Sequence, residues 1–379
     1  MLFVHARSLT LGPMALLLAG IDEAGYGPTL GPMCVGLTVW RLADWDQPDV
    51  TPNLWKLLNP YVSRKAPSAA RAKRPSSPIA IADSKVLKRP NDATAIHPLA
   101  HLERGVFAAL ACSPSGWLMS GGPGPCDDAA LLSMLLPPVE NPPPVCTGPA
   151  PSVPDIRWCT AAEHWYVTDP TPLPVASTPD HLRIAANMMQ RGLRNANASV
   201  VDMRCRVIAE SEFNGIVRRT RNKADVTLMA VGEHMRRIVG LAAAFPGDTV
   251  HIVCDRLGGR EHYADVIESL IPGSRTLDAE ESIDRSRYWV DHQGRRIGVR
   301  FQVEAERSHM PVALASMVAK LMRELAMARF NRYWSRRALD LCGLEIKPTA
   351  GYSTDARRWL TDAAAFLEDM DRSAMVREL

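Results

Sequence analysis

The sequence predicts an α/β fold, in which helices cover a β-sheet. Three observations support this prediction. Apolar segments rich in strand-forming residues occupy residues 14–23, 33–41, 200–208 and 249–254. Apolar residues recur at helical spacing in two long segments, 222–243 and 310–334. A helix predicted at about 261–270 directly follows the strand at 249–254, which makes a strand–helix unit. The chain of 379 residues is long enough to bury a substantial core.

The remaining elements are predicted from the same patterns. The first two strands are expected to form a hairpin, because a glycine- and proline-rich turn joins them. We expect helices at 101–110, 180–198 and 355–369, and two strands within 287–305 around a turn at 292–294. The segment 156–168 is expected to return to the sheet.

One domain is expected over residues 14–379, after an N-terminal segment, 1–13, that carries no interpretable pattern. Surface insertions are expected at about 41–80, 113–180 and 270–300. Residues 50–82 contain no acid but several lysines and arginines, which suits either a solvated loop or an arm that contacts phosphates. The glycine- and proline-rich part of 113–180 suits a surface insertion or a linker.

Composition narrows the class of protein. The formal net charge of +3 is too small to argue by itself for nucleic-acid binding. The eight cysteines are scattered without a CxxC pair, which argues against a zinc ribbon or a disulfide scaffold and suits a reducing cytoplasm. No apolar run approaches the roughly 20 residues that span a bilayer. We therefore expect a cytoplasmic protein with no membrane partner.

Acidic residues stand at the ends of two predicted strands. Asp22 and Glu23 end the first strand, and Asp255 follows the strand at 249–254. Adjacent residues on a regular strand point to opposite faces, so Asp22 and Glu23 can share a site only if the strand gives way there, as Gly25 suggests. A strand-end metal site is one interpretation, and a surface acidic pair before a turn is the other.

Three further segments carry polar residues that suit a site. Ser84 and Lys85 stand where a loop meets a helix and could hold a phosphate, although helix capping explains them equally well. In the helix at 310–334, Ser316, Lys320 and Glu324 lie on one face, either as a solvated edge or facing a polar site. Glu304 and Glu306 are either outer carboxylates of a site or a charged pair at the end of a hairpin.

The order of five segments resembles the type-2 ribonuclease H family (ribonucleases HII and HIII). The segments are GIDEAGYGP, ADSK, the strand ending in Asp255, ALASMVAKLMRE and GYST, spread over residues 14–360. The resemblance does not extend to the insertions. It implies an RNase H-like mixed five-stranded sheet flanked by helices, with a C-terminal helical segment.

The resemblance also implies a function. The family cleaves RNA in RNA–DNA hybrids, or ribonucleotides embedded in duplex DNA, with two Mg²⁺ or Mn²⁺ ions, and its members suggest a monomer. It implies that four carboxylates are catalytic and bind the metal: Asp22, Glu23, Asp255 and Glu324. The residues that it implies for substrate binding are Gly25, Tyr26, Gly27, Ser84, Lys85, Lys320 and Tyr352, and among them Tyr352 is expected beside the 2′-OH of the ribonucleotide.

The residue types suit this chemistry, because hard divalent cations prefer carboxylate oxygens and can assist phosphodiester hydrolysis in pairs. Two positions depart from the family. Tyr26 replaces a basic residue that contacts phosphate, and Glu324 replaces an aspartate. These departures leave an alternative open, in which the chain keeps the fold as a weakly active or inactive module that binds nucleic acid or protein.

Overall fold

The computed structural model describes residues 15–72, 74–91, 93–117, 124–136, 161–258 and 260–378. The N-terminal segment 1–13 and most of the proline-rich stretch lie outside the described residues. No helix in the described ranges is long and apolar enough to cross a membrane.

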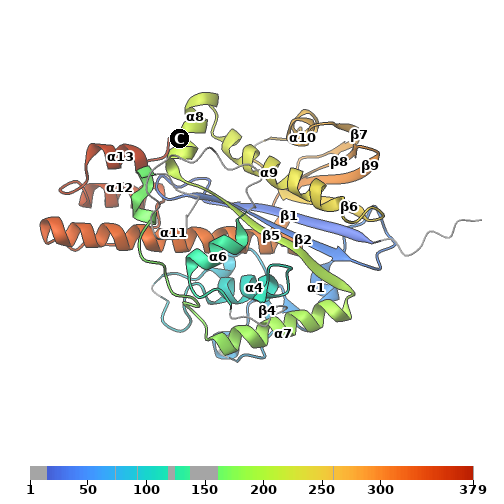
Figure 1. Ribbon diagram of the computed structural model, residues 1–379, viewed down its shortest axis with the longest axis horizontal. Coiled ribbons are helices and arrows are strands. Elements are labelled where there is room, and N and C mark those ends of the chain that lie inside the picture. Colours follow the sequence, from blue (N-terminus) through green and yellow to red (C-terminus); the bar gives the residue numbers. More distant parts are fainter. Residues whose placement is uncertain are drawn as a thin grey trace, which may run out of the picture.

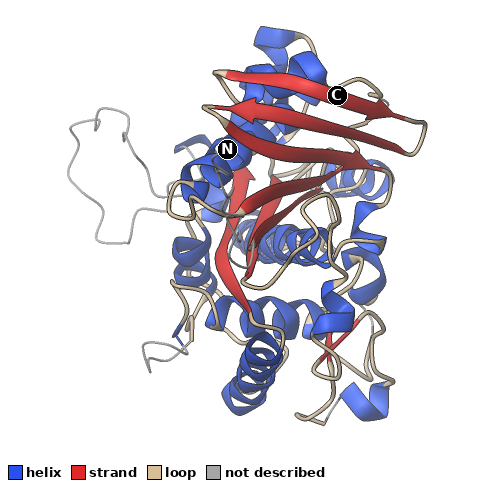
Figure 2. Ribbon diagram, turned by 90° about the vertical axis from the view of Figure 1, so that its right-hand side faces the viewer, coloured by secondary structure: helices blue, strands red, loops and turns tan. Residues whose placement is uncertain are grey.

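A mixed sheet forms the centre of the fold and is drawn in red in Figure 2. Its order is β5-β2-β1-β6-β9-β8-β7. Strands β1, β6 and β9 are parallel, and the other neighbours pair antiparallel. The strands are β1 (Leu16–Ala24), β2 (Met33–Leu42), β5 (Ala198–Ile208), β6 (Thr249–Asp255), β7 (Ser274–Glu281), β8 (Arg285–His292) and β9 (Arg295–Gln302).

The expected mixed sheet flanked by helices is confirmed, and so is the hairpin of β1 and β2. The sheet has seven strands in place of the five expected, because β8 and β7 extend it beyond β9. The described side chains of β7 are mostly exposed, so this edge strand lacks the alternation of apolar residues that reveals a strand in sequence.

Helices cover both faces of the sheet (Figure 1). On one face lie α11 (Met310–Cys342), α4 (Ala100–Ala111) and α7 (Pro179–Asn195). On the other lie α8 (Glu210–Thr220), α9 (Ala224–Ala242) and α10 (Ala264–Leu270). The shorter elements are α1 (Leu54–Leu57), β3 (Val62–Ser63), α2 (Ala69–Ala72), β4 (Ile79–Ala80), α3 (Ser84–Leu87), α6 (Asp128–Leu135), η1 (Ala161–Tyr166), η2 (Ala305–Arg307), α12 (Ser353–Asp362) and α13 (Asp369–Met375).

Two expectations for helices and strands were wrong. The described part of 156–168 is the 3₁₀ helix η1, and not a strand, because Trp165 and Tyr166 pack as buried aromatic side chains beside α11. The single helix expected at 355–369 is two helices, α12 and α13, separated by a short connection. The C-terminal helical segment itself is confirmed.

Strand β1 is buried on both faces. Leu16 and Leu18 join the core beneath α11, whereas Leu17, Ala19 and Ile21 join the core beneath α9. This alternation explains why β1 reads as a continuous apolar run in the sequence. The strand is therefore buried along its length up to Asp22, and Glu23 is partly exposed.

The N-terminal end of α11 lies directly against the backbone of β1 and β2. A Cβ atom at Gly20 would lie 2.2 Å from the carbonyl carbon of Pro311, and one at Gly36 would lie 2.1 Å from the oxygen of Ala315. The Thr38 hydroxyl donates a hydrogen bond of 2.8 Å to the Pro311 oxygen. Glycine is therefore needed at both strand positions for this approach.

We expect Gly36→Ala to lower the free energy of unfolding by at least about 2 kcal/mol, because the added methyl group must push α11 away from the sheet. Chemical denaturation measures the change. Gly240→Ala in α9 is the matched control, because nothing lies within 4 Å of its Cβ position. The control is expected to be neutral or stabilising by up to about 1 kcal/mol. Equal losses in the two variants would contradict the close contact.

A second prediction concerns the buried carboxyl group of Glu103 in α4. It accepts hydrogen bonds from the backbone amides of Val175 (2.7 Å) and Ala176 (2.9 Å). Burial raises its pKa from 4.5 to about 7. The folded protein therefore holds this proton more tightly than the unfolded chain, and stability is lost as the pH rises from about 4.5 to 7.

We expect the stability of the wild type relative to Glu103→Gln to fall by roughly 1–3 kcal/mol over this pH window and to level off above it. Urea denaturation at a series of pH values measures the difference. A difference that rises with pH over the same window would show that the folded state prefers the ionised group.

Candidate functional site

Carboxylates meet at the carboxyl edge of the parallel strands. The last paired residues of the parallel strands β1 and β6 are Ile21 and Cys254. Asp22 and Asp255 come directly after them and therefore lie on neighbouring strands at the same level. Glu23 follows, and its amide donates a hydrogen bond of 2.8 Å to Asp22 Oδ1. The sequence allowed Asp22 and Glu23 to share a site only if the strand gave way there, but β1 continues to Ala24 in its pairing with β2. Only its pairing with β6 ends there.

The charges of these three carboxylates act on one another. Asp22 is 7% exposed, and burial, followed by repulsion from Glu23 and Asp255, raises its pKa. Burial and then Asp255 raise the pKa of Glu23 to about 7. Burial also raises the pKa of Asp255, although backbone amides of Ala305 and Arg256 oppose the shift. The structure therefore brings the three predicted residues together as a cluster short of positive charge.

Helix α3 supplies a cation to this cluster. The Asp83 side chain caps the helix by accepting a hydrogen bond of 2.8 Å from the Lys85 amide. Burial lowers the pKa of Lys85, but Asp83, Asp22 and other nearby carboxylates outweigh it and raise that pKa. The charge of Lys85 in turn lowers the pKa values of Glu23 and Asp255. Lys85 thus lies close to the carboxylate cluster, and Asp83 caps the helix that carries it.

Ser84 reaches the cluster through α11. Its hydroxyl lies 2.9 Å from the hydroxyl of Ser316, which forms a hydrogen bond with Asp22 that lowers the pKa of this carboxyl. Ser84 and Ser316 are both buried. They therefore hold Asp22 in place.

A fourth carboxylate, Glu306, belongs to the cluster. It lies in η2, directly after β9, and is 8% exposed. Burial, followed by the charges of Asp255 and Asp83, raises its pKa, and its charge acts on Glu23 and Lys85. Glu304, its companion in the sequence, is exposed and pairs with Arg307 at 2.7 Å.

From the sequence, Glu306 was either an outer carboxylate of a site or part of a charged pair at the end of a hairpin, and the sheet explains why it lies at the cluster. Strand β9 is parallel to β6, so the residues after it reach the same edge of the sheet as Asp22 and Asp255.

Glu324 does not join these carboxylates. It forms ion pairs with Lys320 (2.8 Å) and Lys88 (3.7 Å), and it lies two helical turns beyond Ser316. Eight residues of α-helix span about 12 Å, so only the Ser316 end of this polar row reaches Asp22. Glu324 instead lines a pocket of about 690 Å³ beside Thr349 and Ala350.

The turn after β1 is held by two buried arginines. Arg377 donates hydrogen bonds to the backbone oxygens of Gly25 (2.6 Å) and Tyr26 (2.7 Å). Arg323 of α11 donates to the oxygens of Leu30 and Ala350, both at 3.1 Å. The basic residue of the α11 segment therefore supports the turn, and the role of Arg377 was not predicted from the sequence.

The glycine–tyrosine loop packs on the same turn. The amides of Thr29 and Leu30 both donate to the oxygen of Gly351. Tyr352 is 45% exposed, and the Lys320 ammonium lies 5.9 Å from its ring centroid. The structure thus brings the predicted substrate residues Gly25, Tyr26, Lys320 and Tyr352 into one region around the turn, with Gly27 in open space beside them.

The donor set suits a hard divalent cation, because it consists of carboxylate oxygens that repel one another. Within the described residues, no group of three or more His, Cys, Asp or Glu side chains is already close enough to hold a metal ion. The case for such an ion therefore rests on the donor type and the charge of these residues, and not on a preformed set of ligands. We conclude that the residues fit such an ion by chemistry and by charge.

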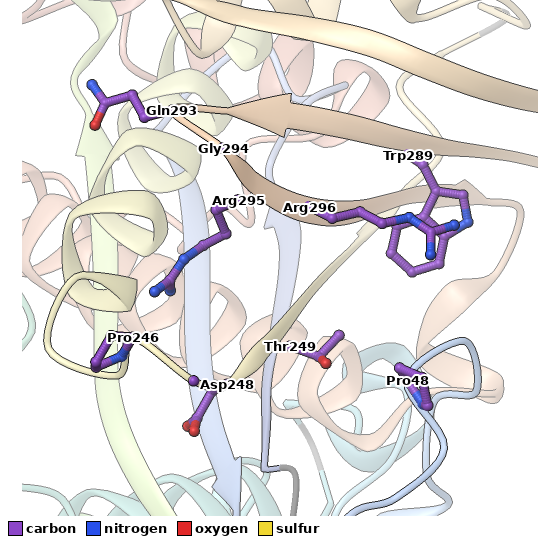
Figure 3. Close-up of a pocket in the computed structure, with 10 residues that line it drawn as sticks. Pro48, Pro246, Asp248, Thr249, Trp289, Gln293, Gly294, Arg295 and Arg296 are labelled. Atoms are coloured by element: carbon purple, nitrogen blue, oxygen red, sulfur yellow. The ribbon is translucent and has the colours of Figure 1, made fainter. Parts of the chain in front are cut away.

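Another pocket, of about 430 Å³, lies at the opposite edge of the sheet. Figure 3 shows Asp248 and Thr249, at the start of β6, across the pocket from Gln293 and Gly294 in the turn between β8 and β9. The Arg296 guanidinium lies 3.8 Å from the ring centroid of Trp289. This pocket is at the far end of the strands from the carboxylates and contains none of the predicted site residues.

Comparisons with known proteins find distant similarity only. No protein-family model matches the chain, and no curated protein matches it. A chain of the PCNA:RNase HII complex from Archaeoglobus fulgidus matches with a TM-score of 0.39 and 12% identity, covering 95% of this chain and 93% of that chain. Ribonuclease H2 from Pyrococcus horikoshii OT3 matches with a TM-score of 0.36 and 11% identity, covering 94% and 96%. These values do not place the chain in a family.

Proposed function

We propose that the protein is a metal-dependent endoribonuclease that hydrolyses RNA in RNA–DNA hybrids or ribonucleotides embedded in duplex DNA. The observation that carries the proposal is the meeting of Asp22, Glu23, Asp255 and Glu306 at one edge of the sheet, with Lys85 beside them. The order of the five sequence segments supports the same activity. Mg²⁺ or Mn²⁺ is the expected cofactor.

Asp22, Glu23, Asp255 and Glu306 are the proposed metal ligands. When bound, a pair of divalent ions supplies Lewis acidity toward the phosphate and lowers the pKa of water. The chain holds the ligands in place through Ser316 on Asp22 and through the Ala305 amide, which donates a hydrogen bond of 3.1 Å to Asp255 Oδ1. Lys85 is placed to neutralise part of the charge of the substrate phosphate.

Recognition of RNA requires contact with the 2′-OH, the group that distinguishes RNA from DNA. Tyr352 suits this role, because its side chain is half exposed and stands on a loop that hydrogen bonds to the turn next to the carboxylates. Lys320 lies beside the Tyr352 ring and is a second candidate for contact with the substrate.

Cleavage of two labelled duplexes tests the proposal, one with a single ribonucleotide in DNA and one with a continuous RNA strand paired to DNA. We expect the wild type to cut at least one of them with Mg²⁺ or Mn²⁺. Asp22→Asn and Glu306→Gln are expected to reduce the rate at least about 100-fold, because each removes a charged ligand. If the folded wild type cuts neither duplex with either metal, the alternative of a binding module is favoured.

Glu324→Gln is the matched control for Glu306→Gln, and it tests the sequence-based prediction that Glu324 is a ligand. Both changes replace the carboxylate of one glutamate by a neutral amide of the same shape. We expect Glu324→Gln to stay within about tenfold of the wild-type rate, because Glu324 pairs with Lys320 and Lys88 and not with the cluster. A loss as large as that of Glu306→Gln would return Glu324 to the ligand set.

Metal binding can be measured without substrate. An ion that binds only the folded state stabilises it by about 2.7 kcal/mol at a concentration 100 times its Kd. We expect Mn²⁺ to raise the free energy of unfolding of the wild type by this mechanism, and to do so much less for Asp22→Asn. Isothermal titration calorimetry gives the Kd. Equal stabilisation of both proteins would show that the ion binds elsewhere.

A further inference from the structure

The connection between α8 and α9 reaches the turn after β1 through Lys223, and it carries a group of positive charges. We define the basic rim as Arg219, Arg221 and Lys223. Arg219 and Arg221 are exposed, and Lys223 is half buried. None of the three forms an ion pair with any residue in the described part of the chain, whereas the neighbouring Arg218 pairs with Glu378 at 2.6 Å. The rim therefore has positive charge available for a ligand.

Tyr26 connects this rim to the site. The Lys223 ammonium lies 4.9 Å from the centroid of the Tyr26 ring, a cation–π contact. Arg377 fixes the backbone of Tyr26 by donating a hydrogen bond to its carbonyl oxygen. Tyr26 follows Glu23 by three residues in the chain, and the charge of Glu23 acts on its hydroxyl. Tyr26 thus contacts Lys223 and is near enough to Glu23 to sense its charge.

The rim and Lys85 approach the cluster from opposite faces of the sheet. Lys85 belongs to α3, which packs on the α11 face through Ser84 and Ser316. Tyr26 packs against the core on the α9 face. Phosphates recur about every 3.4 Å of helix axis along each nucleic-acid strand, so a strand cleaved at the carboxylates carries further phosphates to either side of them. Those phosphates need cations, because the cluster repels them.

We propose that Lys223, held over the Tyr26 ring, binds a phosphate of the nucleic-acid backbone next to the carboxylate cluster, and that Arg219 and Arg221 continue this contact along the strand. The proposal deepens the proposed function, on which it rests for the class of substrate. It gives Tyr26 a specific role, because the ring positions the ammonium group that makes the contact. The contact is to phosphate and therefore does not depend on base sequence.

Binding in the absence of cleavage tests this proposal. Asp22→Asn protein is titrated into a fluorescein-labelled RNA–DNA hybrid in EDTA at a series of KCl concentrations, and anisotropy gives the binding constant. Adding Lys223→Gln is expected to weaken binding several-fold and to reduce the slope of log K against log salt by about 0.9, the value for one phosphate contact on a duplex. Lys223→Arg is expected to keep the slope.

Two further variants separate the rim from a general loss of charge. Arg191→Gln removes an exposed cation from α7. This helix leads into the start of β5, at the opposite end of the strands from the carboxylates, so the variant is expected to leave the slope unchanged. Tyr26→Phe keeps the ring and is expected to bind as the parent does, whereas Tyr26→Leu removes the ring and is expected to lose part of the effect. Circular dichroism checks that each variant folds.

The outcomes distinguish this proposal from the proposed function. If Lys223→Gln leaves the slope unchanged, and the protein cleaves when Asp22 is restored, phosphate binding by the basic rim is refuted and the proposed nuclease function stands. A reduced slope in a protein that never cleaves supports the rim and overturns the nuclease. A slope reduced equally by Arg191→Gln overturns the rim, because the effect then follows net charge and not position.

Discussion

The direct packing of α11 on β1 and β2 is the contact on which the rest of the structure depends. Gly20 and Gly36 let the helix backbone reach the strand backbones. The close approach of the helix brings Ser316 within hydrogen-bond distance of Asp22. Further along the same helix, it also positions Arg323, which holds the turn after β1. One rigid helix thereby fixes both the acidic end of β1 and the loop that follows it. A side chain larger than glycine at Gly20 or Gly36 would push the helix away from the sheet, and with it Ser316 and Arg323.

Electrostatic strain accompanies this arrangement. The sheet brings Asp22, Glu23 and Asp255 together in a buried place, where burial and mutual repulsion raise their pKa values. One lysine, Lys85, offsets part of the repulsion. A structure that only needed stability would gain by replacing such carboxylates with apolar side chains. Their presence at the edge where three parallel strands end therefore does not serve stability, and it is consistent with the cation site that we propose.

Much of the frame could be predicted from the sequence, because it depends on local patterns. The apolar run of β1 and the helical spacing in α9 and α11 are such patterns, and each leads to the correct element. Glu306 could not be selected in this way, since its η2 turn has three residues and no periodicity. Glu324 shares a face of α11 with Ser316, but sequence spacing does not tell which end of that face reaches the acids. Edge strand β7 lacks a buried face and so lacks the pattern of a strand.

The turn itself was predicted from its glycines and prolines, but the long-range hydrogen bonds that hold it could not be. Three segments far apart in the chain converge on residues 25–32: Arg323 from α11, the loop at Gly351, and Arg377 near the C-terminus. Gly25 has a φ of +89°, and a Cβ there would lie 2.9 Å from the Arg323 side chain, so glycine is required by both the backbone and the space. The arginines are buried and occupied with backbone oxygens, which leaves them unable to bind phosphate. A cation for the substrate on this side of the cluster must therefore come from outside the turn, and the residue whose charge stands over Tyr26 is Lys223.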